Sequence, residues 1–203
     1  MEEKIIFVSE AYEIEGLFEK NDGEKGVVIT HPHPLYGGDM YNYVVEAILH
    51  AYKKSGYTTL RFNFRGAGRS QGMYDNGVGE QKDIRSAISY LLGQNIKQID
   101  LAGYSFGAWV NAKVACNDDL VRNMVMVSPP AGFMDFQPVS AMPCLKLVVS
   151  GERDEIARAD LIKDMVPIWN PKARLEIIKG AGHFYSGHLE KLQGILEGVV
   201  GQE

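Results

Sequence analysis

The chain has 203 residues, of which 45% are hydrophobic and 23% are charged, with 22 glycines and 8 prolines. That length suggests a single domain spanning residues 1–203, and the composition excludes disorder, collagen-like structure and coiled coil. The formal net charge of −5 disfavours partners such as nucleic acid or an acidic membrane surface, because both require a basic face.

No uninterrupted apolar run exceeds four residues, whereas a membrane-spanning helix needs about 20. The first residues, Met1-Glu2-Glu3-Lys4, lack the basic start and apolar stretch of a secretory signal. Cys116 and Cys144 stand in apolar surroundings without metal-binding spacing, so we interpret them as small buried side chains rather than as a disulfide. We therefore expect a cytoplasmic location.

The predicted elements begin with two alternating segments, 5–9 and 11–19, that pair as an antiparallel hairpin at one edge of a sheet. After a turn at 21–23, short β-branched runs alternate with runs of helical period. Further strands are predicted at 27–30, 57–62, 99–103, 121–127, 145–150 and 175–178. Helices are predicted over 44–51, 84–91, 106–115, 156–166 and 189–199, the fourth ending at Pro167. Such alternation indicates an α/β fold with a mostly parallel sheet and helices on both faces.

In sheets of this kind ligands bind at the carboxyl ends of the strands, so the residues after each strand are candidates for a site. The strand at 99–103 runs directly into Gly103-Tyr104-Ser105-Phe106-Gly107, the G-x-S-x-G pattern of a nucleophile elbow. Only small neighbours allow a strand and a helix to cross so closely, and the turn exposes the Ser105 hydroxyl. Serine also caps helices, but the strand before it and the helix after it favour a nucleophile.

A serine hydroxyl needs a base, and the base needs an orienting acid; in this architecture the chain order is Ser, then Asp or Glu, then His. Asp154 follows the strand at 145–150, and His183 follows the strand at 175–178. These two residues are therefore the candidate acid and base.

Each of these two partners has alternatives. Asp154 could serve merely as a cap for the following helix, in which case Glu152 or Asp135 could supply the acid instead. His188 is the rival base, although we expect it at or inside the closing helix and facing solvent.

An oxyanion hole is the fourth requirement. One backbone N–H is expected from Phe106, directly after the nucleophile, and the other from the loop His31-Pro32-His33-Pro34-Leu35-Tyr36-Gly37-Gly38. The two prolines have no N–H, which leaves Leu35 and Tyr36 after the second of them, and we favour Leu35.

Two other motifs, a possible zinc site and a possible dinucleotide-binding loop, match their patterns less well than the Ser, His and Asp residues match a triad. His31 and His33 have a spacing that can begin a zinc site, but no HExxH motif or further ligand accompanies them. The segment 64–72 reads G-x-G-x-x-x-G rather than the dinucleotide-binding G-x-G-x-x-G, and no GK[ST] phosphate loop occurs. We therefore expect neither a metal nor another cofactor.

These motifs resemble those of the α/β-hydrolase superfamily over most of the chain. The resemblance rests on HPHPLYGG (31–38), RFNFRGAGRSQG (61–72), GYSFG (103–107), GERDE (151–155) and GAGHFY (180–185). Within the superfamily the chain is most similar to small, lidless, dienelactone-hydrolase-like serine hydrolases of bacteria. It departs from dienelactone hydrolases proper, which carry a cysteine nucleophile, and its HPHP loop replaces the HGG type of many esterases.

The expected activity is therefore a serine hydrolase that acts on small-molecule esters or thioesters through Ser105, His183 and Asp154. The segment 128–144 is too short for a substantial cap, so we expect an open pocket. Selectivity would come from nearby aromatic residues, namely Tyr36, Tyr41, Phe133, Phe136 and Tyr185. Lactonase or peptidase activity uses the same parts, and a binding module without turnover is the rival from another class. The sequence does not specify the oligomeric state.

Overall fold

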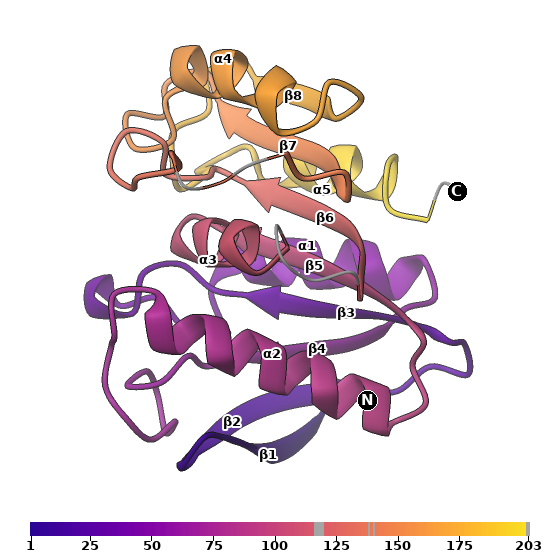
Figure 1. Ribbon diagram of the computed structural model, residues 1–203. Helices are drawn as coiled ribbons and strands as arrows, with labels where there is room; N and C mark the ends of the chain where they lie inside the picture. Colours follow the sequence, from indigo (N-terminus) through magenta and orange to yellow (C-terminus); the bar gives the residue numbers. More distant parts are fainter. Residues whose placement is uncertain (116–119, 138, 140, 202–203) are drawn as a thin grey trace.

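The computed structural model describes residues 1–115, 120–137, 139 and 141–201. Its eight strands form one sheet in the order β1-β2-β4-β3-β5-β6-β7-β8 (Figure 1). β1 pairs with β2, and β2 with β4, in antiparallel fashion, while the remaining pairs are parallel. The strands are β1 (Glu3–Ser9), β2 (Tyr12–Glu19), β3 (Lys25–Thr30), β4 (Thr58–Phe62), β5 (Gln98–Tyr104), β6 (Val121–Val127), β7 (Leu145–Gly151) and β8 (Arg174–Ile178).

Helices cover both faces of this sheet. One face carries α1 (Tyr43–Lys54) and α5 (Leu189–Glu197), which lie side by side. The other face carries α2 (Val78–Gly93), α3 (Phe106–Ala115) and α4 (Ala159–Trp169) (Figure 1). The predicted architecture, a mostly parallel sheet between two helical layers with an antiparallel hairpin at one edge, is confirmed.

Each helical layer packs on its own cluster of buried apolar side chains, and the central strands contribute to both. Val28 of β3 belongs to the cluster beneath α2, α3 and α4, whereas Val27 and Ile29 belong to the cluster beneath α1 and α5. All three side chains are completely buried. A strand covered on both faces must be apolar at successive positions, which explains the continuous run of branched residues in the sequence.

No helix or strand forms within the described part of the 128–144 segment between β6 and β7, so no cap covers the carboxyl ends of the strands there. Cys144 in this segment is partly buried against the core, and Cys116 lies outside the described residues. In the part of the chain that the structure describes, every helix is too short or too polar to cross a bilayer.

The fourth helix differs from the prediction at both ends. It begins at Ala159 rather than near 156, because Ile156 and Ala157 form a turn in which their N–H groups donate to the Asp154 carboxylate. It also continues through Pro167 to Trp169. Proline in a helix removes one hydrogen bond, but here the last turn is held by tertiary packing: the Trp169 ring lies 5.0 Å from that of Phe136, and the Trp169 carbonyl accepts the Met142 N–H at 2.6 Å.

A buried ion pair holds the glycine-rich loop that follows β4. Arg65 is 3% exposed, and its guanidinium lies 2.8 Å from the completely buried carboxylate of Asp83 on α2. The Arg65 backbone N–H donates to the same carboxylate at 3.0 Å. The glycine at position 79 leaves room for the guanidinium, because a side chain there would overlap it. The loop is thereby fastened to α2.

We predict that Asp83→Ala lowers the free energy of unfolding by about 3 kcal/mol, because it leaves the buried Arg65 charge paired with just the partly exposed Glu10 carboxylate at 3.3 Å. Urea denaturation measures the change. Arg158→Ala is the matched control, since it breaks an ion pair with Asp160 whose partners are both more than half exposed. Equal, small losses in the two variants would contradict this role for the buried pair.

His31 joins the loop after β3 to the loop after β4. Its ring is completely buried, its Nε2 accepts the Phe64 N–H at 3.0 Å, and its Nδ1 lies 2.6 Å from the Pro32 carbonyl. These contacts fix the neutral tautomer with the proton on Nδ1. Burial lowers the pKa of His31 to about 4, against a weaker opposing effect of the hydrogen bond to Pro32.

His31 therefore makes stability depend on pH. Below its unfolded pKa of about 6.5 the unfolded chain binds a proton that the folded protein excludes until about pH 4, so stability falls as pH drops through that window, by roughly 1.4 kcal/mol per unit. Burial also raises the pKa of Asp100 to about 6, which stabilises the folded state as pH falls and opposes the effect of His31 on the total. We therefore expect the free energy of unfolding, measured in urea between pH 7 and pH 4.5, to fall more steeply with decreasing pH in the wild type than in His31→Gln. His50→Gln, which removes an exposed histidine of α1, should leave the slope intact. An unchanged slope in His31→Gln would refute the assignment.

Candidate functional site

Ser105 occupies a strained turn between β5 and α3. Its φ of +53° lies in the left-handed region, which non-glycine residues seldom adopt. The glycines on either side of it are required by close packing: a Cβ at position 103 would lie 2.5 Å from the Thr30 hydroxyl, and one at position 107 would lie 2.7 Å from the His31 carbonyl. The G-x-S-x-G pattern is thus explained by the contact between this turn and the end of β3.

The side chains of Ser105, His183 and Asp154 meet above the carboxyl ends of the central strands. His183 Nε2 lies 2.9 Å from Ser105 Oγ. His183 Nδ1 lies 3.0 Å and 2.9 Å from the two carboxylate oxygens of Asp154. All three residues are at most 9% exposed, so the hydrogen bonds are largely shielded from water. The arrangement permits a proton to pass from the hydroxyl to the imidazole while the carboxylate holds the ring.

The Asp154 carboxylate is surrounded by donors. Oδ1 accepts the N–H groups of Ile156 and Ala157 at 3.0 Å and 2.7 Å, and Oδ2 accepts the Ser128 hydroxyl at 2.8 Å. Burial alone would raise the pKa of Asp154, but the hydrogen bonds from His183, Ala157 and Ser128 outweigh it and hold the pKa below its ordinary value. Asp154 therefore stays ionised beside the imidazole. Asp154 thus caps this turn and also faces His183. The sequence analysis had treated these two roles as alternatives.

The rival acids and bases have other partners. Glu152 accepts the N–H of Gly180 at 2.9 Å, and Asp135 accepts the N–H of Gln137 at 2.7 Å. His188 stands at the N-cap of α5, with Nδ1 bonded to the Ser186 carbonyl at 2.9 Å. None of these three contacts Ser105 or His183 among the described hydrogen bonds.

The expected oxyanion donor Leu35 is engaged within its own loop. The HPHP segment closes into a short 3₁₀ helix, η1 (Pro34–Tyr36), in which the Leu35 N–H donates to His33 Nδ1 at 3.2 Å and the Tyr36 N–H donates to the His33 carbonyl at 3.1 Å. The sequence analysis did not anticipate this turn, which gives the N–H groups of Leu35 and Tyr36 acceptors of their own and thus counts against its choice of Leu35, with Tyr36 as second option. The His33 N–H in the same loop has no such acceptor among the described residues.

His33 lies beside the nucleophile. Its ring centroid is 4.8 Å from that of Phe106, the residue after Ser105. The backbone N–H groups of His33 and Phe106 have no acceptor within the described part of the chain. Both are thus available to a bound group, while the His33 ring itself caps η1.

The predicted aromatic residues divide into exposed and buried sets. Tyr36 is 88% exposed and Phe133 is 75% exposed, so both rings are open to solvent at the carboxyl ends of the strands. Tyr185 and Phe136 are buried and cannot form the wall of an open pocket. Tyr41 is half exposed and lies over the Arg61 guanidinium at 5.6 Å.

Phe184 is an exposed aromatic residue that the sequence analysis missed. It is 72% exposed, and its ring centroid lies 5.6 Å from that of His183. Its position directly after the candidate base is the signal that could have identified it. We call Leu35, Tyr36, Met73, Phe133 and Phe184, the exposed apolar residues on loops after β3, β4, β6 and β8, the apolar rim.

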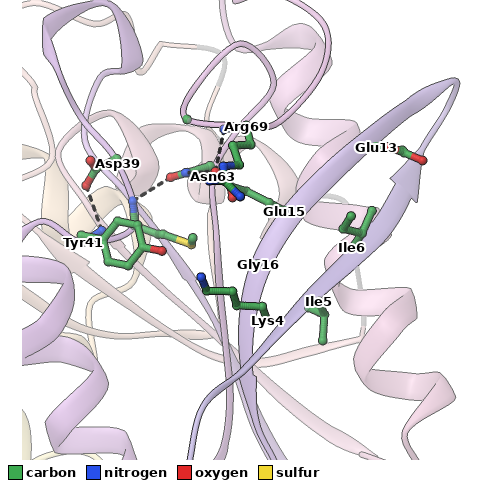
Figure 2. Close-up of a pocket in the computed structure, with 12 residues that line it drawn as sticks. Lys4, Ile5, Ile6, Glu13, Glu15, Gly16, Asp39, Tyr41, Asn63 and Arg69 are labelled. Atoms are coloured by element: carbon green, nitrogen blue, oxygen red, sulfur yellow. Dashed lines mark hydrogen bonds between the residues drawn. The ribbon is translucent and has the colours of Figure 1, made fainter.

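A hollow of about 750 Å³ lies elsewhere, between the β1–β2 hairpin and the loop at 39–41 (Figure 2). Lys4, Glu13, Glu15, Asp39 and Arg69 are among its charged lining residues, and Ser105, His183 and Asp154 are not part of it. The hydrogen bonds drawn across it fasten the loop after β4 to β2, since Asn63 and the Arg69 N–H both donate to Glu15. The hollow is therefore separate from the candidate active site.

A metal centre at His31 and His33 is not supported by the geometry, because both ring nitrogens of His31 are bonded to backbone groups. In the described ranges no group of three or more His, Cys, Asp and Glu side chains is placed to hold an ion.

Similar proteins were compared with the chain. No family model matches it. An uncharacterized protein of Rickettsia prowazekii is 34% identical over 194 residues, which cover 90% of this chain and 82% of that protein. Among solved structures, an α/β serine hydrolase homologue from Coxiella burnetii is 34% identical with a TM-score of 0.91, covering 98% of this chain and 97% of that one. An α/β serine hydrolase without a lid from Xanthomonas campestris is 29% identical with a TM-score of 0.88, covering 98% and 93% of the two chains.

These relatives support the superfamily and the absence of a lid, while the closer affiliation with dienelactone hydrolases stays a prediction. The likeness extends over nearly the whole chain and agrees with the sheet order, the strained turn at Ser105 and the open carboxyl ends of the strands. The chain therefore belongs to the α/β-hydrolase superfamily.

Proposed function

We propose that the protein is a serine hydrolase that cleaves carboxylic esters or thioesters of small molecules. The observation that carries the proposal is the unbroken set of contacts from Ser105 Oγ to His183 Nε2 and from His183 Nδ1 to Asp154. In this mechanism His183 removes the hydroxyl proton as Ser105 attacks the carbonyl carbon, and then donates that proton to the leaving group. Water activated by His183 releases the acyl group in the second half of the reaction.

The oxyanion would be held by the backbone N–H groups of Phe106 and His33. Each donor of this kind contributes about 3 kcal/mol to stabilisation of the transition state. The prolines at 32 and 34 restrict the backbone on both sides of His33, and the buried His31 fastens the start of the loop. The donors are thus fixed before the substrate arrives, which is what electrostatic stabilisation requires.

The apolar rim supports a substrate with an apolar acyl or alkyl group. Phe184 lies beside His183, and Tyr36 contacts the His33 ring at 4.9 Å, so apolar surface flanks the reacting atoms on two sides. Esters and thioesters are favoured over peptides because an open rim offers few polar groups to orient an amide backbone. Lactone cleavage uses the same parts and remains the second candidate. The cytoplasmic location stays a prediction.

Replacing the nucleophile tests the proposal. We expect Ser105→Ala to abolish turnover of p-nitrophenyl acetate and covalent labelling by a fluorophosphonate probe, because Ser105 supplies the attacking oxygen in the proposed mechanism. Ser186→Ala, at an exposed serine on the His183 loop, is the matched control and should be labelled like the wild type. Labelling of Ser105→Ala would remove Ser105 from the mechanism, and an unlabelled, inactive wild type would favour a binding module.

Shortening the rim tests the substrate class. Each added methylene that becomes buried contributes up to about 0.8 kcal/mol, so kcat/KM should rise from acetate to hexanoate p-nitrophenyl esters. Phe184→Ala and Tyr36→Ala should lower kcat/KM for the hexanoate roughly tenfold and for the acetate much less. Tyr43→Ala, an equally exposed aromatic residue on α1, should change neither. Equal losses on both esters would show that the rim does not bind the acyl chain.

A further inference from the structure

Two buried hydroxyl groups lie behind Asp154, on the side away from the imidazole. Ser128, the first residue after β6, places its Oγ 2.8 Å from Asp154 Oδ2. The Tyr185 hydroxyl lies 2.7 Å from the same Ser128 Oγ and 3.4 Å from the Val149 carbonyl. Both residues are 0% exposed, so neither can touch a substrate in this arrangement.

The direction of these hydrogen bonds follows from counting protons. A carboxylate only accepts, so the single proton of the Ser128 hydroxyl points to Asp154. Ser128 then has no proton left for Tyr185, so the tyrosine hydroxyl donates to Ser128 at 2.7 Å in preference to the more distant Val149 carbonyl at 3.4 Å. The result is a one-way series from Tyr185 to Ser128 to Asp154. Such series polarise each bond and strengthen the last one.

The backbone at both positions is also unusual. Ser128 has a φ of +45° and Tyr185 a φ of +52°. Left-handed backbone is unfavourable for a residue with a Cβ, and for a bulky one such as tyrosine it is a clear outlier. The conformations are held by the Ser128 N–H, which donates to the Val149 carbonyl at 2.7 Å, and the Tyr185 N–H, which donates to the Gly182 carbonyl at 3.1 Å. Strained residues that persist around a reaction centre point to a functional constraint.

We propose that Ser128 and Tyr185 are positioning residues that lock the Asp154 carboxylate, and through it the His183 ring, in the orientation needed for proton transfer. The inference deepens the proposed function and rests on it. With Ile156 and Ala157 holding Oδ1 and Ser128 holding Oδ2, the carboxylate cannot rotate away from His183 Nδ1 without breaking hydrogen bonds on both oxygens.

Other titratable groups around the pair stay uncharged near neutral pH. Tyr104 on β5 lies against the His183 ring at 5.3 Å between centroids, and its hydroxyl donates to the His183 carbonyl at 2.9 Å. Burial raises the pKa of Tyr104 and of Tyr185 far above neutrality. Ionisation of these two tyrosines therefore contributes nothing to the pH dependence of the reaction below pH 8.

The test uses Ser128→Gly, Tyr185→Phe and the double variant. Glycine removes the hydroxyl and also suits a positive φ, so the backbone is relieved rather than strained. We expect kcat for p-nitrophenyl acetate to fall about tenfold in Ser128→Gly with KM unchanged, as for the loss of one charge-assisted hydrogen bond. In Tyr185→Phe the kcat should fall less, because Ser128 can still donate to Asp154. The double variant should be no slower than Ser128→Gly alone, since the series is already broken there.

The pH profile separates positioning from a general loss of packing. The Ser128 hydroxyl stabilises the state in which Asp154 is ionised and His183 is neutral more than the state in which His183 is charged. Removing it should therefore move the rising limb of kcat against pH to higher pH. Ser70→Ala is the matched control, since Ser70 is likewise buried, donates to the Asn63 carbonyl at 2.6 Å and accepts the Glu15 N–H at 3.1 Å. Ser70→Ala should lower the stability of the fold without moving the rising limb of kcat against pH.

A readout without turnover separates this inference from the proposed function. The proton NMR signal of His183 Nδ1–H should shift in Ser128→Gly and stay in place in Ser70→Ala, whether or not the protein hydrolyses an ester. An unchanged kcat, pH limb and Nδ1–H signal in folded Ser128→Gly would overturn the positioning role. A shifted signal in a protein that no fluorophosphonate labels would support the positioning role and overturn the proposed function.

Discussion

The close contact between the ends of β3 and β5 is the constraint on which the site depends. Thr30 pairs with Gly103 in the parallel ladder, so the chain leaves both strands at the same level. The first turn of α3 must then pass against Thr30 and His31, and only glycine at 103 and 107 leaves space for it. Ser105 is forced into a left-handed conformation between them, and the same contact sets the His33 loop beside Phe106. The candidate nucleophile and the proposed oxyanion donors are thus placed by one packing requirement.

The loops that follow β6, β7 and β8 complete the site from the other side. Ser128, Asp154 and His183 each come shortly after one of these strands, and parallel pairing brings those ends to one edge of the sheet. The hydrogen bonds that join them are buried, so each is formed away from competing water. The fold therefore supplies the proximity, and the loop chemistry supplies the orientation.

Local patterns in the sequence were sufficient for the sheet, the helices and the three residues that meet at its edge. Branched apolar runs such as 27–30 predict buried parallel strands, and G-x-S-x-G predicts the turn at Ser105 because its steric rule is local. Features that depend on distant partners could not be predicted. Helix α4 passes Pro167 because Trp169 packs on Phe136, far away in the chain. Leu35 looked available for a more local reason, since the sequence does not reveal the η1 turn that brings its N–H back to the His33 ring two residues before it. Tyr185 looked like a pocket residue because nothing local reveals that Ser128 accepts its hydroxyl proton.

The uncovered carboxyl edge has a consequence for the fate of the acyl-enzyme in the proposed mechanism. No described element folds over the rim, so the bound acyl group would remain in contact with bulk solvent throughout its lifetime. A site without a closing segment needs no opening step before the second substrate enters. Because no segment selects water over other nucleophiles at the acyl-enzyme, an alcohol or a thiol at high concentration would compete with water for the same carbonyl carbon. If the proposed mechanism operates, an open architecture of this kind would thus also transfer the acyl group to an acceptor other than water.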